Sequence, residues 1–335
     1  MSKLNIYEGT MLITTLLCAK IFISYPLLGE NFSGFEILFI NIAAFLIVYT
    51  ILNAALKVSF GNEKIRNVLS ALIFITIVVF LSFSFCAYVR SLKFSLLYNS
   101  PEGFISFIIV PAIVIGALSG IKSLGKMCAV FTPAILIITA VFMLFSCRFL
   151  DSSSLFPVFG EGIGVFPKYI IILLSSLWES IFVMFLPEFV KDEKSIKKIV
   201  LYSLLISFFF FAFTGVIFNI NGIKKATEYS EIFKTIRLIK PTSSMERPDS
   251  VFYIIYVFLM LLYMSISVFF AKHIFKTVFK ITYSEVLIVP LCLIISLFAV
   301  TGLDSGFSLL VYKGVFSVLW CFAFLSPLLN RGNKT

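Results

Sequence analysis

Long apolar runs separated by short charged loops dominate this sequence. Residues 199–218 and 251–271, for example, contain no charged side chain. A run of 18 or more apolar residues predicts a transmembrane helix, because about 20 residues of helix cross the hydrocarbon core of a bilayer. With 60% hydrophobic residues, 13% charged residues and a mean hydropathy of +1.07, the chain has no polar stretch long enough for a soluble domain. The sequence therefore predicts an all-α polytopic membrane protein with a single transmembrane domain over residues 1–335.

About ten transmembrane helices are expected. They lie at about residues 10–28, 35–56, 68–92, 104–119, 127–146, 169–190, 199–218, 251–271, 287–301 and 307–329. One connection, residues 219–250, is much longer than the others. Its apolar residues recur at helical spacing before Pro241, which predicts an amphipathic helix over about residues 229–240 that lies on the surface of the bundle.

The distribution of positive charges predicts the orientation in the membrane. Lys and Arg concentrate in the short loops on the side of the N-terminus, such as residues 191–198, whereas the short loops on the other side carry few. Because cytoplasmic loops are enriched in Lys and Arg, both termini are expected in the cytoplasm and residues 219–250 outside it. We therefore interpret the formal net charge of +10 as a topology signal, not as a nucleic-acid-binding surface.

Two charges lie near the middle of apolar spans, Lys20 in the first and Glu179 in the sixth. An even number of spans, with one such charge at the start of each half, suggests two five-helix repeats at about residues 8–147 and 168–329. Since five is odd, the second repeat enters the membrane from the opposite side and gives an inverted repeat. In such folds helices 1 and 6 are broken near the midplane, and their freed backbone groups help to form the ligand site.

Lys20 and Glu179 are the first candidates for a ligand-binding site, because an ionisable side chain at mid-span is costly unless it is paired. In one interpretation an amino acid lies between them, with its carboxylate toward Lys20 and its ammonium toward Glu179. In another, the two side chains form a direct ion pair that fills the site and holds helices 1 and 6 together. Snorkelling of the charges toward the lipid surface is a third interpretation, and the residues alone leave all three open.

Polar and aromatic residues on the spans that would face this pair extend the candidate site. Trp178 is expected to form an aromatic wall over a bound ammonium, or else to serve packing. Any single serine hydroxyl has the alternative of bonding to the backbone of its own helix. The candidates are Ser84 and Tyr88 in span 3, Ser175, Ser176 and Trp178 beside Glu179, and Tyr263 and Ser267 in span 8.

Motifs for catalysis, metals and nucleotides are incomplete. The six cysteines have no CxxC or CxxH spacing and His273 is the single histidine, so we predict neither a metal nor another cofactor. Gly120-x-x-x-x-Gly125-Lys126 resembles the start of a P-loop, but it joins two apolar helices and lacks the following Ser or Thr. Gly116 and Gly120 instead predict close helix packing. No catalytic arrangement is present, so we predict that the chain is not an enzyme.

Several segments, taken in order, resemble the spore germination permease family, the B-subunit of GerA-type nutrient germinant receptors in the amino acid/polyamine/organocation superfamily. The matching segments are residues 21–29, LFPVFGEG at 155–162, LWESIFVMFLPEFV at 177–190, residues 233–239, and MERPDSVF at 245–252. The resemblance implies a LeuT-type fold of five plus five helices, with a ligand site between helices 1, 3, 6 and 8. It adds Ala19, Ile21 and Phe22, beside Lys20, to the candidate site.

The function that the resemblance implies is nutrient sensing. Proteins like this lie in the inner membrane of spores with an A-subunit and a lipoprotein C-subunit, and they signal germination on binding a small nutrient such as an amino acid. The expected partners are these two subunits, the nutrient and membrane lipid, with no nucleic acid. The alternative is a secondary transporter that carries an amino acid with a proton or cation. A third reading is a structural subunit whose Lys20–Glu179 pair closes the site and binds no ligand.

Overall fold

The computed structural model describes residues 3–19, 34–56, 63–95, 97–146, 166–190, 192–220, 248–279 and 284–300. The expected amphipathic helix at 229–240 and the expected last span at 307–329 lie outside these residues. The described elements are all helices, with one isolated β-bridge, as the all-α prediction requires. In chain order they are α1 (Ile6–Cys18), α3 (Gly34–Ala55), α4 (Glu63–Ser95), α5 (Glu102–Leu118), α6 (Ile121–Ser146), α7 (Phe166–Ser176), the 3-10 helix η5 (Trp178–Glu188), α8 (Glu193–Ile220), α10 (Pro248–Phe279), the 3-10 helix η6 (Ser284–Leu287) and α11 (Ile288–Val300).

Five of the described helices are long and apolar enough to cross a membrane. Their spanning segments are Phe35–Asn53 in α3, Ser70–Lys93 in α4, Ile121–Phe142 in α6, Lys194–Val216 in α8 and Phe252–Phe279 in α10. The chain is therefore a multi-pass membrane protein, as predicted. The full count of about ten spans, the inverted repeat and its two halves stay predictions.

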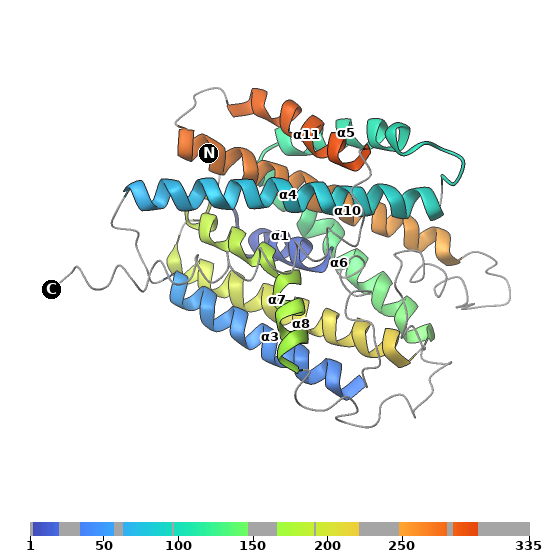
Figure 1. Cartoon of the computed structure of the whole chain (residues 1–335). Coiled ribbons are helices and arrows are strands. Elements are labelled where there is room, and N and C mark those ends of the chain that lie inside the picture. The colour runs from blue at the N-terminus through green and yellow to red at the C-terminus, as the bar shows by residue number, and fades with distance from the viewer. Residues whose placement is uncertain are drawn as a thin grey trace.

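Helix α1 lies at the centre of the bundle (Figure 1). Every residue from Gly9 to Cys18 is buried, because α6, α8, η5 and α10 all pack against this helix. Helices α4, α5, α10 and α11 pack together on one side of α1, and α3, α7 and α8 pack together on the other. Gly9 permits the close approach of α8, since a Cβ atom at this position would lie 2.7 Å from Ile199 Cδ1. A helix that is apolar all round suits such an enclosed position.

A capping box begins α1 and also joins it to α6. The Asn5 side chain caps the first turn, and the Asn5 backbone N–H donates to Glu8 Oε2 at 2.9 Å. Lys122 Nζ, at the start of α6, donates to the same carboxylate at 2.6 Å and to the Lys3 carbonyl at 2.9 Å. Burial by itself raises the pKa of Glu8, but the bond from Asn5 and the bond and charge of Lys122 outweigh it. The pKa of this carboxyl, which precedes the expected span, therefore lies below its ordinary value of 4.5.

The segment before α1 pairs with the end of η5. The Leu4 N–H donates to the Phe189 carbonyl at 2.9 Å, and Leu4 and Val190 form a parallel β-bridge. Beside them, Glu188 Oε2 lies 2.7 Å from His273 Nε2 of α10. The start of the chain, the end of η5 and the last part of α10 are thus held together at one end of the bundle.

The two glycines that predicted close helix packing have different roles. A Cβ atom at Gly116 would lie 2.8 Å from Ser265 Cβ and closer still to its hydroxyl, so α5 and α10 approach closely there. Gly120, in contrast, has open space around its Cα atom and a φ of 83°. It forms the turn into α6 in a conformation that other residues rarely adopt. The packing prediction is therefore wrong for Gly120.

Candidate ligand-binding site

The expected sixth span, residues 169–190, changes helix type at Leu177. Helix α7 ends at Ser176, Leu177 has φ −98° and ψ 14°, and the chain continues to Glu188 as the 3-10 helix η5. A 3-10 helix of this length is uncommon, because its hydrogen-bond geometry is poorer than that of an α-helix, and such stretches often mark functional positions. The change of helix type falls two residues before Glu179.

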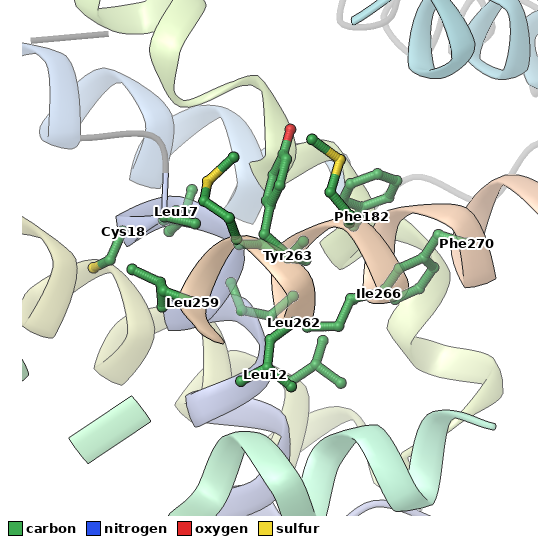
Figure 2. Close-up of a cluster of buried hydrophobic side chains, with 14 of the residues drawn as sticks. Leu12, Leu17, Cys18, Phe182, Leu259, Leu262, Tyr263, Ile266 and Phe270 are labelled. Carbon is green, nitrogen blue, oxygen red and sulfur yellow. The ribbon is translucent and has the colours of Figure 1, made fainter. Parts of the chain in front are cut away.

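Glu179 lies in the first turn of η5 and has no solvent exposure. Tyr263 of α10, which is also fully buried, donates a hydrogen bond of 2.8 Å to Glu179 Oε1. In Figure 2 the Tyr263 side chain rises from α10 with its hydroxyl pointing away from the cluster of Leu12, Leu259 and Leu262. A buried carboxyl group requires such donors, because burial removes its hydration. The structure thus brings together two residues that the sequence placed in the candidate site.

Aromatic rings pack beside this pair. The Trp178 ring contacts Phe80 of α4 at a centroid distance of 4.9 Å and Phe182 at 5.6 Å. Phe182 in turn stacks on Phe270 of α10, with centroids 4.8 Å apart and an interplanar angle of 17°, and both rings are labelled in Figure 2. The ring of Trp178 therefore has aromatic neighbours on both α4 and η5.

Helices η5 and α10 run in the same direction, which places Ser267 at their interface. Three contacts fix the register: Glu179 with Tyr263, Phe182 with Phe270, and Glu188 with His273. Ser267 lies one turn after Tyr263 on the same face of α10 and before Phe270, and both of these residues contact η5. Its side chain is fully buried, and its hydroxyl has no hydrogen-bond partner among the described residues.

Ser180 and Glu36 are among the buried polar residues that sequence reasoning missed. Ser180 of η5 is fully buried and its hydroxyl lacks a partner in the described part of the chain. Nothing in its spacing distinguishes it from a serine that bonds to its own helix. Glu36, in the first turn of α3, is only 1% exposed. Glu36 could have been found by the criterion that identified Glu179, because it too is an acid within an apolar run.

The candidates in the third span lie on α4 and face α10. Tyr88 is fully buried and Ser84, one turn earlier, is 3% exposed. The Tyr88 hydroxyl donates to the Val257 carbonyl at 3.4 Å. Tyr88 therefore joins α4 to α10 nearly two turns before Tyr263, and its hydroxyl is directed to the backbone of α10 rather than to Glu179.

The other candidates lie at the end of α1, just beyond it, and at the end of α7. Ala19 is fully buried and ends α1, donating its N–H to the Thr15 carbonyl at 3.0 Å. Ser175 and Ser176 form the end of α7, two and one residues before the change of helix type. Lys20, Ile21 and Phe22 lie outside the described residues. The pairing of Lys20 with Glu179 therefore stays a prediction.

Further polar contacts join α1 to its neighbours. Thr15 Oγ1 lies 2.5 Å from Thr132 Oγ1 of α6, and the Cys18 thiol lies 3.6 Å from Ser207 Oγ of α8. Such contacts hold transmembrane helices together where lipid offers no polar partner. Across the described residues, no group of three or more His, Cys, Asp or Glu side chains is arranged to hold a metal ion.

Comparison with protein families gives an extensive match. A family described as "Spore germination protein" matches residues 37–306 of the chain. Spore germination protein B2 of Bacillus subtilis (strain 168) is 32% identical over 125 residues, which is 36% of this chain and 33% of that protein. The matched region thus spans about a third of the length of this relative.

Solved transporters have a similar fold. Mhp1, a transporter of the nucleobase-cation-symport-1 family in a closed conformation, has a TM-score of 0.63 and 12% identity over 94% of this chain and 74% of that one. A manganese transporter from Eremococcus coleocola has a TM-score of 0.57 and 12% identity, over 97% of this chain and 78% of that one. At these identities the likeness shows the fold alone. These relatives are transporters and a germination protein rather than enzymes, in keeping with the prediction.

Proposed function

The chain belongs to the spore germination permease family, and from this premise we propose that it is the nutrient-sensing membrane subunit of a spore germinant receptor. It binds an amino acid or a similar small molecule in a central site between α1, α4, the α7–η5 segment and α10, and binding signals germination. It lies in the spore inner membrane with both termini in the cytoplasm, beside an A-subunit and a lipoprotein C-subunit. The likeness to spore germination protein B2 supports this setting.

The observation that carries the proposal is the buried Glu179 with its hydrogen bond from Tyr263. Packing alone would be served by an apolar residue at this position, since an ionisable group inside an apolar bundle is costly. A carboxylate attracts the ammonium group of an amino acid, and an aromatic ring such as that of the neighbouring Trp178 can attract the same charge. The proposal therefore assigns the ligand ammonium to Glu179.

The elements around this site also provide a route for the signal. Helix α1 packs against both η5 and α10, and the segment before α1 is bonded to the end of η5 through Leu4 and Phe189. A ligand held between α1 and η5 therefore acts on two segments that are joined again at the end of the bundle. It shifts the conformational equilibrium only as far as it binds the signalling state more tightly than the resting state.

Glu179→Gln tests the site. The variant retains the size of the side chain and an acceptor for Tyr263 but loses the charge that attracts an ammonium. The nutrient concentration for half-maximal germination should rise by about tenfold or more, which corresponds to about 1.4 kcal/mol. The matched control is Glu285→Gln, which changes an exposed acid of η6 and should respond like the wild type. An unchanged response of Glu179→Gln, at wild-type protein level, would show that the central site is wrong.

A thermal-shift experiment on the purified chain tests whether Lys20 contacts the ligand or pairs directly with Glu179. If the ligand lies between Lys20 and Glu179, then Lys20→Gln weakens nutrient binding by the purified chain in a thermal-shift titration. If the two side chains instead form a closed ion pair in a structural subunit, no nutrient shifts the unfolding temperature of the wild type. Lys20→Gln would then lower that temperature in the absence of ligand, because it leaves a buried carboxylate without its counter-charge.

A secondary amino-acid transporter is the second candidate function, favoured by the likeness to Mhp1 and to the manganese transporter. The two functions differ in whether the ligand crosses the membrane. Liposomes that contain this chain alone distinguish them. Accumulation of labelled amino acid above its outside concentration, driven by an imposed proton or cation gradient, shows a transporter, whereas ligand binding without accumulation supports the receptor.

A further inference from the structure

Buried hydroxyl groups in this bundle are usually bonded to their own helix. A serine or threonine in an apolar interior has few other acceptors, so its hydroxyl bonds to a backbone carbonyl about one turn earlier. Examples are the bonds from Thr14 to Thr10, from Ser82 to Val78 and from Thr214 to Phe210, each between 2.6 and 2.8 Å.

Ser180 and Ser267 depart from this pattern. Both are fully buried, yet neither hydroxyl has a hydrogen-bond partner among the described residues. Within the described part of the chain, nothing replaces the hydration that burial has removed from each hydroxyl, which disfavours the folded state. Each of the two helices that meet at the Glu179–Tyr263 bond supplies one of these groups, η5 providing Ser180 and α10 providing Ser267.

Ser267 lies on α10, the same helix as Tyr263, whose hydroxyl bonds to Glu179. Ser267 lies one helical turn, about 5.4 Å, beyond Tyr263 on the face of α10 that meets η5. The stacked rings of Phe182 and Phe270 close the same interface just beyond it. An acid, a hydroxyl without a partner among the described residues and a pair of stacked rings thus follow one another along the contacts between η5 and α10.

We infer that Ser267 and Ser180 bind the second polar group of the ligand whose ammonium is bound by Glu179. This inference rests on the proposed function and names the ligand class of the same site. The ligand is a short compound that carries an ammonium and, a few bonds away, an oxygen that accepts a hydrogen bond from a hydroxyl, as in an α-amino acid. The stacked rings exclude long polyamines, and Glu179 rejects carboxylic acids that lack an amine.

The test compares each amino acid with the amine that lacks its carboxylate. The full-length chain in detergent is titrated with the twenty standard amino acids, and the tightest-binding one is then compared with its decarboxylated amine. Ser267→Ala should weaken binding of the amino acid by about tenfold, the cost of one hydrogen bond to a charged group, and leave binding of the amine unchanged. Ser180→Ala should also weaken binding of the amino acid but not of the amine, by a smaller factor.

The matched control is Ser265→Ala, on the same helix. Ser265 faces α5, where its hydroxyl bonds to the Ile113 carbonyl at 3.5 Å, so its removal should leave the affinity for both compounds unchanged. The unfolding temperature without ligand gives a second readout. Ser267→Ala should keep or raise it, because the variant removes a hydroxyl without a partner, whereas a purely structural role predicts a decrease.

The outcomes separate the inference from the function on which it rests. If Glu179→Gln abolishes binding while Ser267→Ala and Ser180→Ala bind the amino acid like the wild type, the inference is wrong and the site stands. If Glu179→Gln binds like the wild type, the proposed site itself is wrong. If none of the twenty amino acids binds to the wild-type chain, both are overturned.

Discussion

Lys122 of α6 lies 2.6 Å from the Glu8 carboxylate of α1, and this carboxylate also accepts the backbone N–H of Asn5. One side chain therefore caps the central helix and joins it to a second helix. Because both contacts favour the charged form of the acid, they hold the pKa of Glu8 low despite its burial.

Glu8→Gln should lower the stability of the folded chain by about 0.5–1 kcal/mol near neutral pH, because Gln can still cap the helix but cannot pair with Lys122. A folded-state pKa below the unfolded one contributes stability above the ordinary value of 4.5, and this stability is lost as the pH falls toward the folded value. The difference between the wild type and Glu8→Gln should therefore shrink below about pH 4. Thermal unfolding in detergent across this pH range measures it.

Lys126→Gln is the matched control for this prediction, because Lys126 is exposed and acts on Glu8 through its charge alone. Its effect should stay within about 0.5 kcal/mol. An identical pH dependence of the wild type and Glu8→Gln would contradict the assignment.

Gly116→Ala should separate α5 from α10, because the new methyl group would lie 2.8 Å from Ser265 Cβ. Overpacking of this kind costs about 1–3 kcal/mol. Gly103→Ala, on the same helix, introduces the same methyl group where no heavy atom lies within 4 Å, and it should be neutral or slightly stabilising. Equal unfolding temperatures of the two variants would disprove the close contact.

Tyr263→Phe removes the hydroxyl that donates to Glu179 and retains the ring. Loss of a hydrogen bond to a buried carboxyl group should cost about 1–3 kcal/mol in thermal unfolding and should weaken nutrient binding, because the acid is no longer held in place. Tyr202→Phe makes the same change at a side chain that is 46% exposed on α8, and it should have no comparable effect. Equal effects of the two variants on stability and on nutrient binding would show that Tyr263 is not part of the site.

Thr15→Val should destabilise the bundle by about 0.6 kcal/mol more than Thr14→Val, within an upper bound of about 1.7 kcal/mol. Both threonines are fully buried on α1 and both bond to their own helix, but only Thr15 also contacts Thr132 of α6. The pair of variants thus isolates the contact between helices. A larger loss for Thr14→Val would contradict it.

The apolar runs predicted the positions of the long helices better than their ends. The run at 251–271 falls within α10, which continues to Phe279 through Lys272 and Lys276. Hydrophobicity reports the part of a helix that suits lipid, whereas the helix itself ends where its hydrogen bonds end. The change to 3-10 helix at Leu177 has no glycine or proline beside it, so the local sequence carries no signal for its position, although a break in this span was expected from the inverted repeat.

The site residues that could be predicted from the sequence were those connected with an acid in an apolar run. Glu179 was found because an acid in an apolar run is costly, and Tyr263 because it lies on a span expected to face that acid. Ser180 was not found, because the sequence does not show whether a buried serine bonds to its own helix. Glu36 carries the same signal as Glu179, but its place in the first turn of α3 concealed its burial.

The enclosure of α1 has a consequence for biosynthesis. This helix is synthesised before the other described helices, yet the helices that bury residues 9–18 end with α10, which is complete only at Phe279. Until α6 is made, therefore, α1 lacks the partners of Glu8 and Thr15, and the partner of Cys18 follows only with α8. The enclosure of α1 is thus complete only after α10 has been made, so assembly is expected to stall, and quality control to act, on chains whose second half is altered.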